Sequence, residues 1–231
     1  MHRGRTLITA VLILGVTALY VAAGLLSLRL AFLHPYVAAV RPATGVALAA
    51  CLLLGTRVWP GVFLGTFVVR ILTLGTVVPA LGIACGNTLT VLLGAHLVRR
   101  LASGCHAFDR ALDIFRFTVF AGLLSPMTSA TLGVASLTLG GFAYWGDSGA
   151  LWWTWWLGDA MGIILVTPLV LSWSNTTHRG PWRHRISAEA MLVCVAAVLV
   201  GLLLFSGLLP GDMAKPLALF ELPLFAWMAF R

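Results

Sequence analysis

Charged side chains are scarce in this chain. Lysine, arginine, aspartate and glutamate together make up 10% of the 231 residues, whereas hydrophobic residues make up 60%. So few polar side chains cannot cover the surface of a soluble domain of this size. The composition excludes a soluble protein and indicates a polytopic membrane protein.

Acidic residues are the rarest charged class, with seven against fifteen basic residues and a formal net charge of +8. A basic chain of this kind could bind nucleic acid, but its arginines stand in short clusters between apolar runs. Membrane topology explains these clusters better than a folded basic face does. We therefore expect the lipid bilayer, and no nucleic acid, as a partner.

Residues that hold metals or cofactors are few and unsuitably spaced. The four cysteines form no CxxC motif, and of the six histidines only His96 lies within an apolar run. This excludes a bis-histidine haem, and the sequence contains no HExxH, glycine-rich phosphate loop or GxSxG motif. We expect no metal, no cofactor and no enzyme activity within the chain.

Long apolar runs predict an all-α fold, a polytopic membrane bundle of about eight transmembrane helices. A spanning helix needs about 20 mostly apolar residues. By this measure the spans are residues 7–28, 37–55, 58–76, 78–98, 117–140, 151–173, 188–209 and 216–231, the last one incomplete. Pro42 and Pro126 are expected to kink or start helices in the second and fifth spans. With no repeat or long linker, residues 1–231 are expected to form a single membrane domain.

The distribution of basic residues predicts the orientation. A cytoplasmic N-terminus places most of them in cytoplasmic segments, namely Arg3, Arg5, Arg57, Arg99, Arg100, Arg110, Arg116, Arg179, Arg183, Arg185 and Arg231. The remaining basic residues are Arg29, Arg41, Arg70 and Lys215. Because cytoplasmic loops of membrane proteins carry an excess of lysine and arginine, both ends of the chain are expected in the cytoplasm.

Glycines four residues apart occur in three of the spans. The pairs are Gly61 and Gly65, Gly82 and Gly86, and Gly158 and Gly162. Such spacing lets helix backbones approach closely, so the third, fourth and sixth spans are expected to share contacts. Glycine is also common in membrane helices, and chance can supply some of these pairs.

A carboxylate lies well inside the sixth predicted span, residues 151–173. Asp159 follows Trp152, Trp155 and Trp156 at helical spacing, which predicts one stripe with the acid about a turn deeper than the tryptophans. An acid inside the bilayer is costly, so it either carries function or forms a structural ion pair. The tryptophans could equally form an interfacial belt.

The predicted topology gives Asp159 neighbours of similar depth. Arg41, Arg70 and Glu221 fall in the same half of the bilayer, and they form either a charge-balanced pocket or two buried pairs with Asp159. Arg41, at a helix end, could instead extend to the lipid headgroups. Asn87 is a further candidate, since an amide in hydrocarbon needs a partner, either a ligand or a neighbouring helix.

Several motifs, in order along the chain, resemble the first class of membrane-associated sensor domain (MASE). They are Pro42-Ala43-Thr44-Gly45, Trp59-Pro60-Gly61 with Gly65, Gly86-Asn87-Thr88-Leu89, Leu97-Val98-Arg99-Arg100, Ser129-Ala130-Thr131-Leu132-Gly133, Trp155-Trp156-Leu157-Gly158-Asp159-Ala160-Met161-Gly162, and Thr167-Pro168. Leu222-Pro223 and the stretch from Trp227 to Arg231 resemble a later element.

The resemblance implies a sensory domain of the bacterial inner membrane, which passes a stimulus to a histidine kinase, diguanylate cyclase or phosphodiesterase. Known members include a hexose-phosphate sensor kinase that works with a transporter-like partner. The chain shows no output domain, so we expect the kinase or cyclase in a further region or in another chain, with a homodimer or a transporter-like membrane protein as other partners. A small transporter or substrate-binding membrane subunit is the alternative, because buried charges and kinked helices suit it too.

The sequence departs from the family pattern at three positions. Arg41 stands where an aromatic residue is expected, Thr90 where members often carry an acid, and Arg70 is unusual for the third span. The hypothesis that follows is a pocket suited to a more anionic ligand.

Overall fold

The computed structural model describes residues 2–29, 41–108 and 110–174, and its regular structure in these ranges is entirely helical. The α-helices are α1 (His2–Arg29), α2 (Pro42–Leu54), α3 (Trp59–Leu74), α4 (Val77–Leu101), α5 (Ala111–Phe117), α6 (Pro126–Leu139) and α7 (Ser148–Ser174). A π-helical segment, η3 (Thr118–Leu124), joins α5 to α6, and the short 3-10 helices are η1 (Thr56–Val58), η2 (Gly104–His106) and η4 (Trp145–Asp147). By length and composition, five helical segments of the described chain could cross a membrane.

The predicted all-α membrane bundle is confirmed, and each of the first six predicted spans contains a helical segment. In the second span, residues 37–55, the helix α2 covers only residues 42–54. The fifth span begins at Ala111, however, and not at residue 117 as predicted. Its charged residues Asp113 and Arg116 suggest a loop, but they lie on one helical turn and pair with each other at 3.6 Å. The predicted spans 188–209 and 216–231 lie outside the described residues.

Both prolines begin an α-helix, at its first position in α2 and in α6. Proline suits this position because its missing N–H would have no partner there. With 13 residues, α2 is about 20 Å long, shorter than the hydrocarbon thickness of about 30 Å. The last carbonyls of α2 are satisfied by other segments, since Arg99 donates to the oxygen of Cys51 and Cys105 Sγ to that of Leu52.

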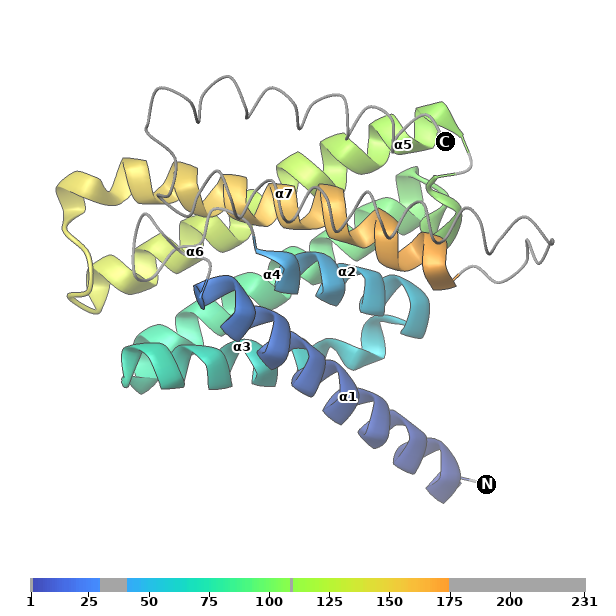
Figure 1. Ribbon diagram of the computed structural model, residues 1–231, viewed down its shortest axis with the longest axis horizontal. Helices are drawn as coiled ribbons and strands as arrows, with labels where there is room; N and C mark the ends of the chain where they lie inside the picture. The colour runs from blue at the N-terminus through green and yellow to red at the C-terminus, as the bar shows by residue number, and fades with distance from the viewer. Residues whose placement is uncertain (1, 30–40, 109, 175–231) are drawn as a thin grey trace, which may run out of the picture. The chain divides into compact units, whose positions relative to one another are not determined.

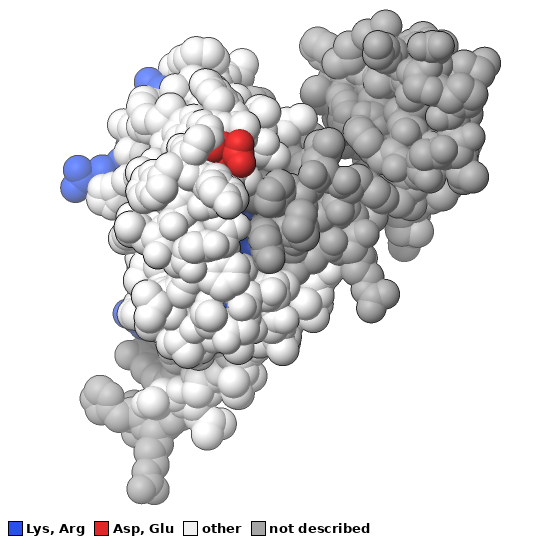
Figure 2. Space-filling view, turned by 90° about the vertical axis from the view of Figure 1, so that its left-hand side faces the viewer, with Lys and Arg blue, Asp and Glu red and all other residues white. Residues whose placement is uncertain are grey.

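The helices run back and forth between two ends (Figure 1). At one end lie the N-terminus of α1, the α2–α3 connection and the C-terminal end of α7. Five arginines, in the last turn of α4, in α5 and in the nearby connections, also belong to this end, and we call it the basic end. These arginines are Arg57, Arg99, Arg100, Arg110 and Arg116. At the other end, the far end, lie the α3–α4 turn and the α6–α7 loop. Figure 2 views the far end, whose described surface is mostly uncharged, with an acidic spot, basic groups at one edge and a little basic surface beside the grey atoms.

Helix packing brings together segments that are distant in sequence. α2 packs on α7, α1 on α3, α3 on α4, and α4 on α6. The buried apolar residues form two separate clusters. One cluster, toward the basic end, includes Val58, Val98 and Phe117, and the other, toward the far end, includes Leu74 and Leu137. Buried polar side chains accompany these clusters, and we call the following set, with the adjoining Tyr20 and Trp155, the polar layer: Arg41, Thr44, Thr66, Arg70, Asn87, Thr90, Ser125, Ser129, Asp159 and Thr167.

Candidate functional site

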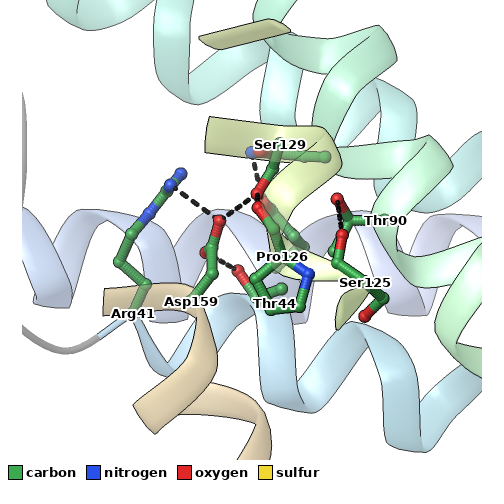
Figure 3. A network of polar contacts seen from close by, with 9 residues as sticks. Arg41, Thr44, Thr90, Ser125, Pro126, Ser129 and Asp159 are labelled. Atoms are coloured by element: carbon green, nitrogen blue, oxygen red, sulfur yellow. Dashed lines mark hydrogen bonds and ion pairs between the residues drawn. The ribbon is translucent and has the colours of Figure 1, made fainter. Parts of the chain in front are cut away.

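The carboxylate of Asp159, on α7, is the centre of the polar layer (Figure 3). The residue is completely buried. Arg41 Nη1 lies 3.2 Å from Oδ2 and forms an ion pair with it. Thr44 Oγ1 donates to Oδ1 at 2.5 Å, and Ser129 Oγ lies 2.5 Å from Oδ2. Three other segments, the residue before α2, α2 itself and α6, thus converge on one side chain of α7.

The backbones of α2 and α7 meet closely beside this carboxylate. The N–H of Arg41 donates to the carbonyl of Gly158 at 3.0 Å, and Thr167 Oγ1 donates to the carbonyl of Gly45 at 3.0 Å. A methyl group added to Gly162 would collide with the carbonyl of Arg41, and one added to Gly45 would collide with that of Gly162. Glycine is therefore required at these positions by the close approach of the two helices.

Asp159 also benefits from the position where α2 begins. Thr44 lies in the first turn of α2, which starts at Pro42, so the carboxylate lies beside the N-terminal turn of that helix. The positive end of a helix dipole stabilises an anion nearby. The ion pair with Arg41, the hydroxyl donors and the N-terminal turn of α2 together offset the free-energy cost of burying the charge of Asp159 away from water.

Ser129 reaches Asp159 from the first turn of α6, immediately after an irregular segment. The π-helix η3 ends at Leu124 and Pro126 supplies no N–H, so carbonyls in this region need other donors. Thr90 of α4 donates to the carbonyl of Ser125 at 3.1 Å, and the indole N–H of Trp156 donates to that of Leu123 at 2.8 Å. The π-helix is thus tied to both α4 and α7 next to the carboxylate.

An indole ring connects the two arginines of the layer. The guanidinium carbon of Arg41 lies 4.5 Å from the ring centroid of Trp155, and that of Arg70 lies 5.0 Å from it. Both distances are typical of cation–π contacts. Trp155 fits because Gly133 of α6 lies directly against its ring, where a larger side chain would clash.

On the side of α1, α3 and α4 the layer continues with Tyr20 and Asn87. Asn87 Nδ2 donates to the hydroxyl of Tyr20 at 3.1 Å, and Tyr20 packs over Gly65. Asn87 Oδ1, Thr66 Oγ1 and Trp155 Nε1 are buried without a hydrogen-bond partner. The layer therefore combines a fully bonded carboxylate with several polar atoms that are not bonded.

The structure brings most of the predicted site residues together. Trp155 and Asp159 are completely buried. Trp152 and Trp156 are partly buried, pack against the same apolar cluster as Trp155 and stack on each other, with ring centroids 6.2 Å apart. Trp152 Nε1 donates to Thr131 of α6.

The side chain of Arg41 does not adopt one of its two expected conformations, the one that extends to the lipid headgroups. Its side chain does not extend to the surface, since the residue is 8% exposed and its guanidinium group is held by Asp159 and Trp155. The start of α2 inside the bundle accounts for this, because Arg41 lies beside the carboxylate and not at the end of a full-length span. The predicted partner Glu221 lies outside the described residues.

The glycine pairs lie at helix contacts, but not at those expected. Gly61 and Gly65 face Val16 and Tyr20 of α1, and Gly82 and Gly86 face Ser136 and Leu132 of α6. Gly162 faces the start of α2. The expected contact between the third and fourth spans is therefore present, but these glycines do not form it. α3 and α4 are neighbours, but each pair faces another helix.

Some residues of the layer could not be chosen from the sequence. Thr44 and Ser129 stand within motifs quoted for the family resemblance, yet nothing in the pattern shows that their hydroxyls face Asp159. Thr167 also stands in such a motif, whereas Tyr20 and Thr66 carried no signal beyond being polar in an apolar run. Within the described ranges, no three histidine, cysteine or acidic side chains gather as a metal site would require.

Comparison with known proteins gives one match. A family model with the description MASE1 matches residues 10–231, which include every residue of the polar layer. Neither the search among curated proteins nor the search among solved structures gave a match.

Proposed function

Because the chain belongs to the MASE1 family of membrane sensory domains, we propose that it is the input domain of a bacterial signalling protein and that the Asp159 cluster couples the stimulus to the output. The family is sensory and non-catalytic, so the output activity is assigned to a cytoplasmic effector, either a histidine kinase or an enzyme of cyclic-di-GMP metabolism. The effector acts in the same protein or in a partner.

The observation that carries this proposal is the ion pair of Arg41 and Asp159, at the start of α2. It joins α2 to α7 and, through Ser129, to α6. The two glycine contacts beside it fix how close α2 and α7 can come. A change in the pairing of Asp159 therefore alters the position of three helices at once, which is what a membrane input domain needs.

The orientation belongs to the same proposal. We place the basic end in the cytoplasm and the far end outside, in a bacterial inner membrane. The described arginines at the basic end support this, since positive residues accumulate on the cytoplasmic side. The stimulus then reaches the polar layer from outside, and the effector lies at the basic end.

A reporter fusion tests the function. Residues 1–231 are fused to a reporter kinase, and its output is recorded over a panel of growth media and added solutes. We expect an output that varies with the conditions for the unchanged chain, and a constant output for Asp159→Asn. The matched control is Thr154→Val, at an outward-facing position of α7 where the hydroxyl bonds only within its own helix. A fusion whose output never varies, while the membranes accumulate a solute, would instead support transport.

A further inference from the structure

The polar layer contains three buried polar atoms without partners, and these carry an inference beyond the carboxylate cluster. They are Thr66 Oγ1, Asn87 Oδ1 and Trp155 Nε1, in residues that are at most 1% exposed. Other buried hydroxyl groups of the described chain donate to an acceptor, for example Thr88 to the carbonyl of Ala84 and Thr90 to that of Ser125. An unbonded polar group in a membrane interior is costly, so three of them in one layer need an explanation.

The three atoms lie at similar depth. Thr66 precedes the end of α3 at Leu74 by eight residues, or about 12 Å. Asn87 follows the start of α4 at Val77 by ten residues, or about 15 Å, and Trp155 follows the start of α7 by seven, or about 10 Å. All three helix ends belong to the far end of the bundle (Figure 1).

Known contacts connect the three positions laterally. Tyr20 bonds Asn87 and packs over Gly65, the neighbour of Thr66. Arg70, one helical turn after Thr66, lies over the ring of Trp155. These contacts link α4 to α1, α1 to α3 and α3 to α7, and each of the three unpartnered atoms belongs to a residue in this series or next to it.

We propose that this region, between Thr66, Asn87 and Trp155, is the binding site for a small polar solute that carries hydrogen-bonding oxygen atoms. The indole N–H can only donate, so the solute must present an acceptor. The amide oxygen of Asn87 needs a donor on the solute, and the hydroxyl of Thr66 can either donate to the solute or accept from it. A molecule with hydroxyl or amide groups can both donate and accept and so satisfies all three, whereas a carboxylate only accepts and a lipid chain satisfies none. That this solute is the stimulus of the sensor rests on the proposed function.

A cavity at the far end offers a route of entry. It has a volume of about 600 Å³ and lies between the N-terminal turn of α4 and the C-terminal turn of α6. Its lining includes Pro79, Gly82, Ser136 and Phe142. Asn87 follows Gly82 by five residues on α4, or about 7.5 Å further into the bundle.

Cysteine accessibility tests the site without knowledge of the natural solute. Thr66→Cys and Asn87→Cys are made separately in a chain whose native cysteines have been replaced, and both are reconstituted in lipid nanodiscs. The probe is a methanethiosulfonate that carries a sulfonate group, which reacts in water-filled sites and not in lipid. Two controls are Thr88→Cys, buried and already bonded in the native protein, and Leu89→Cys, on the exposed face of α4.

We expect the cysteine at position 66 or 87 to react at least tenfold faster than both controls. Equal, slow reaction of all four cysteines would overturn the site. Gel filtration establishes which variants fold. If either Thr66→Cys or Asn87→Cys does not fold, the labelling rate of the other variant decides the test. Labelling needs no output domain, so the two proposals fail separately. A responding reporter with unlabelled cysteines refutes only the solute site, and a silent reporter with labelled cysteines refutes only the sensory function.

Discussion

Replacement of Asp159 by asparagine changes the charge at the centre of the polar layer and little else. The amide oxygen can still accept from Thr44, but the amide nitrogen would face the donors of Arg41 or Ser129. Arg41 keeps its buried position and loses its counter-ion. At 3.2 Å and an effective dielectric constant of about 20, the lost attraction is about 5 kcal/mol. Since burial of the pair also costs free energy, we expect a net loss of about 3–5 kcal/mol, as for other broken buried pairs.

The free energy of unfolding can be measured in mixed micelles by titration with a denaturing detergent, followed by tryptophan fluorescence. Arg116→Gln is the matched control, because the Arg116 side chain is 45% exposed and lies 3.6 Å from Asp113, so its loss should cost less than about 1 kcal/mol. The double variant Arg41→Gln with Asp159→Asn should lose less free energy of unfolding than the two single variants lose in sum. An Asp159→Asn protein within about 0.5 kcal/mol of the unchanged chain would refute the view that this pair holds α2 on α7.

Three further substitutions test other contacts by the same unfolding measurement. Gly162→Ala should destabilise by about 1–3 kcal/mol, because the methyl group meets the carbonyl of Arg41, whereas Gly149→Ala, with open space around it, should change little. Thr167→Val should cost about 1–2 kcal/mol through the lost bond to the carbonyl of Gly45, and an unchanged stability would contradict that bond. Trp156→Phe should cost about 1 kcal/mol and should loosen the π-helix η3, seen as faster amide exchange there, since the carbonyl of Leu123 loses its donor.

The fold was largely predictable from the sequence because lipid leaves few alternatives. An apolar run of about 20 residues has to form a helix that satisfies its own backbone. This is why a helical segment is found in each of the first six predicted spans, five of these segments being long and apolar enough to cross a membrane. The start of the fifth span was misplaced because a charged pair, Asp113 and Arg116, is more typical of a loop than of a helix. The start of α2 at Pro42, later than the predicted residue 37, lies at its contact with α7, which no local pattern contains.

The candidate site was predictable only in part. A buried acid in a span is costly by itself, so Asp159 could be identified from composition alone. Its partners could not, because the choice among many hydroxyl groups depends on which helices pack together and at what rotation. Thr44 and Ser129 are separated from Asp159 by 115 and 30 residues. The side of the layer formed by Tyr20 and Thr66 likewise exists only once α1 and α3 are packed.

The central claim is that the pair of Arg41 and Asp159 couples the stimulus to the output, and the reporter output of the double variant Arg41→Gln with Asp159→Asn tests it most directly. The double variant removes both charges together, so it avoids the buried unpaired charge of either single variant and should remain folded in the membrane. The account predicts an output that stays constant over the panel of media and solutes. A folded double variant whose output varies over the same range as that of the unchanged chain would contradict it.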